Sequence, residues 1–335
     1  MSDFIPSAET HFHAGECDVQ ARALGGPAAR ARMSAIGRMA IRDAMPEQHR
    51  AFFAQLPFVV LGSVDNTGQP WASVLARPPG FVQSPDATHL QVAALPSPTD
   101  PLHGTLRPGA ALGVLGIEPP TRRRNRANGV VGAVTGAGFS LQVRQSFGNC
   151  PKYIQARVPD HLADMPPAAS VAHEGTRLDA AGQAMVAAAD TFFIATAHPQ
   201  STQGAAGEAM HGVDVSHRGG KPGFVRLDRL ATHDELTVPD FAGNQYFNTL
   251  GNIAVHPRAG LLFVDFANGS LLYLAVAART VWDGPELASF EGALRLLKCE
   301  VLSVRRVAHA LPLRWGAVQP SPVLVETGTW RKIAR

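Results

Sequence analysis

The pattern of hydrophobic and polar residues changes once, near the start of the chain. Up to residue 56 the apolar positions recur at helical spacing. Five of them lie close to one helical stripe: Met33, Ile36, Met39, Ala40 and Ile41. Pro46 suits the first position of a further helix. This pattern predicts a helical N-terminal segment over residues 1–56. Its striped helix either docks on the domain that follows or presents an amphipathic face to a membrane or partner.

From residue 57 onward the pattern is that of short strands. The runs 58–65 and 69–76 flank a turn and predict a hairpin, and more short apolar runs follow. Residues 160–176 are rich in proline and alanine, which is typical of a connection between domains. We therefore expect a first domain over 57–158, a linker over 159–178 and a second domain over 179–335.

The second domain repeats the first. Residues 72–82 align with 215–225, and Gly-Phe-Val ends both stretches. Residues 111–118 align with 259–266 in the same order. Ordered agreement of this kind predicts an internal duplication. The expected fold class is mainly β (α+β). Each copy is expected to be one antiparallel barrel-like unit, because closure removes the exposed edges of short strands.

Composition narrows the class of protein. The chain has 335 residues, 45% of them hydrophobic and 17% charged, which excludes disorder as its main state. No apolar run is long enough for a membrane helix, and acids and histidines stand where a signal peptide would be apolar. Three cysteines suit neither a disulfide framework nor a four-cysteine metal site. We expect a cytoplasmic protein, and the net charge of +3 is small for a dedicated nucleic-acid binder.

The common catalytic motifs are missing from the sequence: no serine-hydrolase elbow, zinc-protease helix, P-loop or dinucleotide fingerprint occurs. The run His-Phe-His-Ala-Gly-Glu-Cys at 11–17 suits either a metal site or an ordered turn. Because no second cluster follows, the turn is favoured and no metal is predicted. Cys150 lies near Lys152 and Arg144, which would lower its pKa, but the sequence offers no base for a nucleophile.

Two segments suit an anion. Residues 216–221 combine a hydroxyl group, two permanent cations and glycines that allow close approach. Downstream, a helix beginning near Tyr246 would place Asn244, Asn248 and Thr249 at its positive N-terminal end. Turn capping and a solvated Arg-Lys pair explain the same residues equally well, so both interpretations stay open.

A run of arginines forms a third candidate. On an extended strand Arg122, Arg124 and Arg126 share one face, while Arg123 lies on the other. Like charges on one face suit an anionic ligand or another part of the protein, although plain solvation also explains them. A nucleic-acid groove would need aromatic residues nearby, and this run has none.

These segments together resemble the pyridoxamine 5'-phosphate oxidase-like, FMN-binding split-barrel superfamily. The long tandem members are most similar, through Phe-His-x-Gly-Glu at 12–16, Phe-Gly-Asn-Cys-Pro-Lys-Tyr-Ile-Gln at 147–155, and Pro-Gly-Phe-Val at 79–82 and 222–225. The resemblance implies two six-stranded antiparallel split barrels that pair within one chain. Residues 73–75 replace the Ser-His-Arg of 216–218 by Ser-Val-Leu, so one FMN per chain is expected, held by the second barrel.

The resemblance also implies which residues contact FMN. These are Ser216, His217, Arg218 and Lys221 on one strand and its turn; Asn244, Gln245, Asn248 and Thr249 at a helix start; Arg123, Arg124 and Arg126 on the opposing strand; and Ser146 and Asn149 nearby. Relatives often carry arginines within 244–249. Phosphate binding is therefore expected to depend on Arg218 and Lys221.

By the same resemblance, the expected activity is that of an FMN-dependent oxidoreductase. It would move a hydride or electrons between a small organic substrate and an acceptor, with NAD(P)H or another electron donor. Lys152 and Tyr153 are the candidate proton donors, and Arg124 would hold charge near the reduced flavin or an anionic substrate. The alternative is a non-catalytic protein that binds or senses FMN, haem or a deazaflavin. No membrane or nucleic-acid partner is expected, and the sequence leaves open whether two chains form a homodimer.

Overall fold

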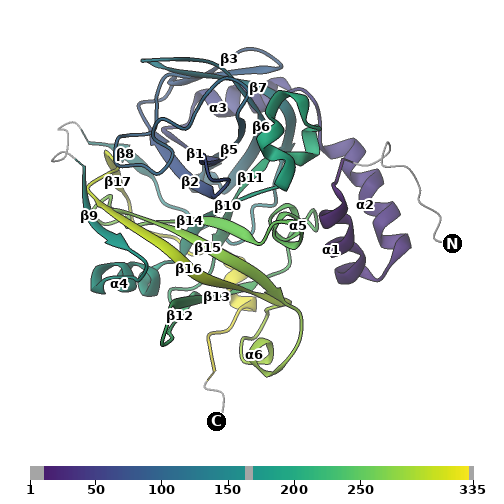
Figure 1. The fold of residues 1–335 in the computed structure, drawn as a ribbon, viewed down its shortest axis with the longest axis vertical. Coiled ribbons are helices and arrows are strands. Elements are labelled where there is room, and N and C mark those ends of the chain that lie inside the picture. Colours follow the sequence, from purple (N-terminus) through teal and green to yellow (C-terminus); the bar gives the residue numbers. More distant parts are fainter. Residues whose placement is uncertain (1–10, 163–168, 332–335) are drawn as a thin grey trace.

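The N-terminal part of the chain is helical. The computed structural model describes residues 11–162 and 169–331 and begins with α1 (Ala14–Leu24), α2 (Pro27–Ala40) and α3 (Glu47–Ala54). Met33 and Ile41 of the predicted stripe are buried, whereas Met39 is 71% exposed. Met33 and Ile41 pack against Phe12 and Tyr246. The stripe therefore docks on the rest of the molecule. Helix α1 lies beside α5 (Asn248–Val255), and α2 packs on α1 (Figure 1).

Most of the remaining chain forms two antiparallel sheets. The first contains β1 (Phe58–Val64), β2 (Pro70–Ala76), β3 (Val82–Asp86), β4 (His89–Val92), β5 (Ala111–Glu118), β6 (Arg123–Thr135) and β7 (Gly138–Gly148). The second contains β10 (Thr191–Ala197), β11 (Val213–Gly219), β12 (Arg226–Arg229), β13 (Asp234–Asp240), β14 (Arg258–Val264), β15 (Leu271–Val281) and β16 (Arg295–Ala308). The fold is thus mainly β with few helices.

The two sheets have the same strand order. It is β2-β1-β5-β6-β7-β4-β3 in the first and β11-β10-β14-β15-β16-β13-β12 in the second. Each path has seven strands where the resemblance implied six. Among the described residues neither path closes on itself, since β2 and β3, like β11 and β12, stand at opposite ends of their paths.

Strand register defines which residues of the two sheets are equivalent. Leu61 pairs with Ser73 and Val114, and Ile194 pairs with Ser216 and Leu261. Ser73 and Ser216 are therefore equivalent, as the sequence alignment had them. The alignment of 111–118 with 259–266 is wrong by one residue, because Val114 corresponds to Leu261 and not to Leu262. Both β5 and β14 are buried on both faces, so their hydrophobic pattern does not specify a register.

The two sheets pack against each other through their equivalent strands. β1, β2 and β5 face β10, β11 and β14, and the core between them includes Phe58 and Val74 of one sheet and Phe193 of the other. A Cβ atom on Gly113 would lie 2.7 Å from the carbonyl oxygen of Val213, and one on Gly260 would lie 2.3 Å from that of Pro70. The two contacts are equivalent by register. Glycine at both positions therefore allows the strands to approach closely on the two sides of a pseudo-twofold axis.

The predicted linker contains short strands. β8 (Pro159–His161) pairs with β17 (Leu313–Trp315), and β9 (Ser170–Gly175) pairs with β16; residues 163–168 lie outside the described part. α4 (Ala180–Ala188) then leads into β10, and the short α6 (Pro285–Ala288) precedes β16. Within 11–162 and 169–331 no helix is long and apolar enough to cross a membrane.

Candidate functional site

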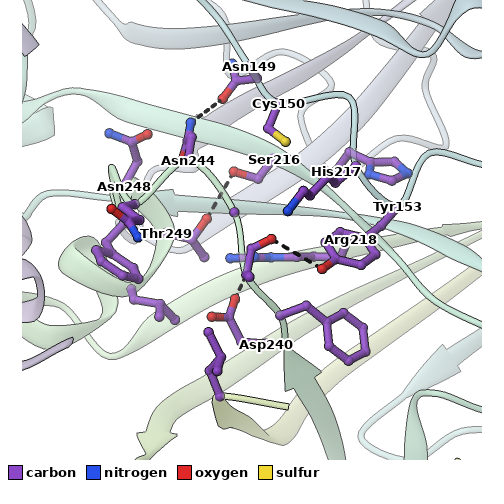
Figure 2. Close-up of a pocket in the computed structure, with 18 of the residues that line it drawn as sticks. Asn149, Cys150, Tyr153, Ser216, His217, Arg218, Asp240, Asn244, Asn248 and Thr249 are labelled. Carbon is purple, nitrogen blue, oxygen red and sulfur yellow. Dashed lines mark hydrogen bonds and ion pairs between the residues drawn. The ribbon is translucent and has the colours of Figure 1, made fainter. Parts of the chain in front are cut away.

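A cavity of about 280 Å³ lies where the two sheets meet. Its walls come from β6 of the first sheet, β11 of the second sheet, helix α5, and the segments 149–153 and 239–245 (Figure 2). Most of the residues predicted from the sequence line it: Arg124, Arg126, Asn149, Lys152, Tyr153, Ser216, His217, Arg218, Asn244, Gln245, Asn248 and Thr249.

Three predicted residues lie elsewhere. The Lys221 ammonium donates to the carbonyl oxygen of Thr327, because Lys221 follows the end of β11 and leaves its face. Arg123 lies over the ring of Phe52, 5.0 Å from its centre, since alternate residues of β6 point to opposite faces. The buried Ser146 hydroxyl bonds to His49 at 2.9 Å. None of the three lines the cavity, so this placement gives no support to their expected contacts with a cofactor.

Arg126 is the best-connected cation of the cavity. It is 5% exposed, and its guanidinium donates to the Asn248 side-chain oxygen at 2.8 Å, to the Ser216 hydroxyl, and to Asp214 at a longer 3.4 Å. Its Nε has no hydrogen-bond partner although the atom is buried. Buried donors normally find partners, so this Nε is an unsatisfied donor in the wall of the cavity.

The N-terminus of α5 lines the same cavity, next to Arg126. Phe247, which precedes the helix, has φ of 61°, and no side chain caps the helix. The first amide groups of a helix lack partners within it and carry a partial positive charge. The Thr249 hydroxyl lies 3.0 Å from that of Ser216 (Figure 2). Two hydroxyls, an amide side chain, a guanidinium and an uncapped helix start thus meet at one corner of the cavity.

Arg124 lines the cavity without a carboxylate partner among the described residues. Its guanidinium donates to the carbonyl oxygen of Cys150 at 2.8 Å and lies 3.4 Å from both the Nδ1 and the carbonyl oxygen of His217. Burial, together with the nearby cation of Arg126, lowers the pKa of Arg124 to about 9. Burial and Arg124 likewise hold the pKa of His217 well below its usual value, so His217 is a neutral acceptor toward Arg124.

Two further arginines share one carboxylate. Arg218 and Arg295 approach the two oxygens of Asp240 at 2.8 and 3.0 Å, and the guanidinium of Arg295 lies over the ring of Phe247, 4.8 Å from its centre. With one carboxylate for two cations, this group keeps a net positive charge. The cavity as a whole is therefore electropositive, and positive charge in a recess attracts anions.

The loops at the cavity mouth contain unusual backbone. Tyr153 and Gln245 have φ of 65° and 64°, a region that non-glycine residues adopt at a cost and that is common at ligand sites. The Asn244 amide donates to Asn149 at 3.2 Å, which joins the two loops (Figure 2). The ring of Tyr153 packs 5.0 Å from that of Phe241, and burial raises the pKa of the Tyr153 hydroxyl. The mouth thus offers a flat aromatic pair beside polar side chains.

The 11–17 run forms a helix start, as favoured from the sequence. The Nδ1 of His13 accepts from the Gly15 amide and Glu16 accepts from the His13 amide, which together make a capping box at α1. Rings of His198 and His211 lie beside His13, with centres 4.9 and 6.5 Å away. In the described part of the chain no group of three or more His, Cys, Asp or Glu residues has the geometry to hold a metal ion.

Sequence reasoning missed three charged residues here. Asp240 ends β13 and Arg295 begins β16, and only the pairing of these two strands brings them together. Glu16 is 3% exposed and bonds to Asn248 from the far side of the cavity wall. Burial and the nearby Asp214 raise its pKa well above the usual value. In the sequence Glu16 was noted only as part of the 11–17 run and the 12–16 motif, and neither indicated a contact with Asn248.

Comparisons with known proteins give limited similarity. No protein-family model matches the sequence, and no curated protein matches it. A candidate pyridoxamine 5'-phosphate oxidase of Lactobacillus delbrueckii is similar over 32% of this chain and 95% of its own, at 19% identity and a TM-score of 0.25. HupZ of Group A Streptococcus covers 36% of this chain and 92% of its own, at 10% identity and a TM-score of 0.25. The haem storage protein HutZ of Vibrio cholerae covers 39% of this chain and 95% of its own, at 12% identity and a TM-score of 0.24.

Proposed function

We propose that the cavity binds flavin mononucleotide and that the chain is an FMN-dependent oxidoreductase. It would be built from two split barrels of the pyridoxamine 5'-phosphate oxidase-like kind, paired within one chain. The observation that carries this proposal is the surplus of cations at the cavity: among the described residues Arg124 has no carboxylate partner, and Arg218 and Arg295 share Asp240. Such a cavity suits a ligand that brings its own negative charge.

The phosphate group fits the corner at the start of α5. Arg126, Ser216 and Thr249 supply donors there, together with the uncapped amides of the helix. This differs from the expectation that Arg218 and Lys221 hold the phosphate, because Arg218 is paired with Asp240 and Lys221 bonds to Thr327. Each hydrogen bond to a charged group contributes about 1.5–3 kcal/mol. A few such bonds are enough for binding in the micromolar range, which corresponds to about 8 kcal/mol.

The rest of the cavity fits a planar, polar ring system. Tyr153 and Phe241 offer flat apolar surface, Asn149 has a buried Nδ2 without a partner, and Lys152 lies beside them. The two-electron chemistry would come from the isoalloxazine ring. Arg124 would stabilise negative charge on the ring or on an anionic substrate, and Lys152 or Tyr153 would supply a proton. The raised pKa of Tyr153 keeps its hydroxyl protonated at neutral pH.

Flavin binding tests the proposal directly. Purified protein is expected to be yellow, with the visible absorption bands of oxidised flavin, and the apoprotein should bind FMN at least tenfold more tightly than riboflavin. The factor follows because riboflavin lacks the phosphate and forgoes at least one charge-assisted bond. A Soret band would favour haem instead, and protein that takes up neither flavin would refute the assignment.

Turnover separates an enzyme from a binding protein. Under anaerobic conditions NADH or NADPH should bleach the bound flavin, and an added acceptor should restore its colour. Retention of FMN without bleaching by any donor would leave a binding or sensing role in place of catalysis.

A further inference from the structure

Helix α1 packs very closely against α5, the helix whose N-terminus lines the cavity. A Cβ atom on Gly15 would lie 2.4 Å from the carbonyl oxygen of Gly251, and one on Gly251 would lie 2.4 Å from the Glu16 side chain. Glycine at both positions allows the first turn of α1 to contact the backbone of α5 directly. That contact places Glu16 directly behind the start of α5.

Two polar side chains of α1 hold the residues that begin α5. The Gln20 amide donates to the carbonyl oxygen of Tyr246 at 3.2 Å. Glu16 accepts from the Nδ2 of Asn248, and its other oxygen accepts from the His13 amide at 2.8 Å. Between these anchors lies Phe247 with its positive φ. The turn that precedes α5 is therefore held by residues of α1, which lie outside the second sheet.

The bonds of Asn248 have a defined direction. A guanidinium only donates, so Asn248 must present its oxygen to Arg126, from which it accepts at 2.8 Å. Its amino group must then face Glu16, and Glu16 must accept. A bonded chain thus runs from Glu16 through Asn248 to Arg126 and on to the Ser216 hydroxyl.

We propose that Glu16 is a positioning residue for the anion site, and that it holds the Arg126 guanidinium in its binding orientation through Asn248. The proposal rests on the proposed function only for the identity of the anion, a phosphate monoester. The capping box uses only one oxygen of Glu16, the one that accepts from the His13 amide. Its second oxygen, buried with the first, accepts from Asn248, and a buried carboxyl oxygen is costly without such a bond. The bond to Asn248 explains why a carboxyl group is buried here, because it fixes the side chain that holds Arg126.

Replacement of Glu16 by glutamine, Glu16→Gln, tests this with almost no change of shape. Both oxygens of Glu16 accept bonds, so a glutamine must turn its amino group toward one of the two donors. Either the α1 cap or the orientation of Asn248 is then lost. We expect FMN affinity to fall about tenfold, as for one charge-assisted bond, with riboflavin affinity unchanged.

A matched control is Asp179→Asn at the start of α4. Asp179 also caps a helix, by accepting from the Gly182 amide at 2.8 Å, and pairs with Arg306. It does not line the cavity. This variant should lose stability but keep the wild-type ratio of FMN to riboflavin affinity. An equal change of the ratio in both variants would refute positioning by Glu16.

A second measurement does not depend on flavin. In ligand-free protein the Nε–H resonance of Arg126, assigned by its loss in Arg126→Lys, should shift or broaden in Glu16→Gln. The Arg126 resonance should return to its wild-type position in the double variant Glu16→Gln with Asn248→Asp. There the aspartate accepts from both the glutamine at position 16 and Arg126. An unmoved resonance in the single variant overturns the inference. If wild-type protein binds no flavin, the proposed function fails while this resonance still decides the role of Glu16.

Discussion

The same pair of sheets offers two equivalent sites, and only one of them is open. By register, Ser216 corresponds to Ser73, and Arg126 to Tyr273. In the open site Ser216 and Arg126 face the cavity. In the other, Ser73 and Tyr273 both donate to the buried carboxylate of Asp100, at 2.6 and 2.9 Å. One copy thus leaves room for an external anion, and the other fills the place with a carboxylate of its own.

The other polar side chains of the cavity follow the same division. Arg124, His217 and Arg218 of the open site correspond to Leu271, Val74 and Leu75 of the closed one. Val74 and His217 both line a second cavity of about 20 Å³, together with further equivalent pairs of the two sheets. The two sheets thus share one strand order, while different side chains at a few equivalent positions line an open cavity on one side and fill the core on the other.

The largest effect is expected at the residue that differs most. Arg126→Met should weaken FMN binding by about a hundredfold, since it removes more than one charge-assisted bond to the phosphate. The control is Arg123→Met. Arg123 belongs to the same strand, β6, but lies over the ring of Phe52 outside the cavity, so this variant should bind FMN like the wild type. Titration of both apoproteins by flavin fluorescence checks this. Equal affinities would place the phosphate elsewhere.

The closed site should respond in stability and not in binding. Asp100→Ala leaves two buried hydroxyls, Ser73 and Tyr273, without their acceptor, which should lower the free energy of unfolding by about 2 kcal/mol. Urea denaturation measures the loss, and FMN affinity should stay at the wild-type value. Loss of FMN binding at unchanged stability would mean that the two sites are not independent.

Replacement of Arg124 should lower FMN affinity without lowering stability, the opposite of the result expected for Asp100. Arg124→Leu introduces the residue type of the closed site and removes a buried cation without a carboxylate partner. We expect unfolding to need as much or more denaturant, because a poorly compensated charge is removed, while FMN affinity falls about tenfold. A variant that loses stability and keeps its affinity would contradict this.

The start of α1, beside the open site, contains a buried histidine that makes stability depend on pH. Burial and neighbouring histidines lower the pKa of His13 to about 3 and that of His198 to about 4. Unfolding releases these groups to their ordinary pKa near 6.5, so the unfolded state binds more protons and stability falls as the pH drops below about 6.5. His13→Asn keeps a cap acceptor and should lose about 2 kcal/mol less than the wild type between about pH 7 and 5. Urea denaturation at both values checks this, with His89→Asn as the control.

The smallest effect is expected at Lys221. Lys221→Ala removes the bond to the Thr327 carbonyl oxygen and should leave FMN affinity unchanged within error, although the resemblance implied a phosphate contact. A clear loss of affinity in the titration would restore that contact and move the phosphate toward the end of β11.

Much of the architecture was predictable because it depends on local patterns. The strands, the turns and the repeat follow from short apolar runs and from the repeated Pro-Gly-Phe-Val. The alignment of β5 with β14 was wrong by one residue, since strands buried on both faces carry no periodic signal. The family resemblance grouped Arg123 and Lys221 with the site, yet strand alternation and a turn point them away from it.

The sequence by itself determined that this chain contains two related β units behind a helical segment, and which strands carry its cations. Only the tertiary structure decided which cations lack a partner. Asp240 meets Arg218 and Arg295, and Asp100 meets Tyr273, through contacts that join residues far apart in the chain. Whether a charge is free to bind a ligand depends on distances of a few ångström between such residues, and the packing of the two sheets sets those distances.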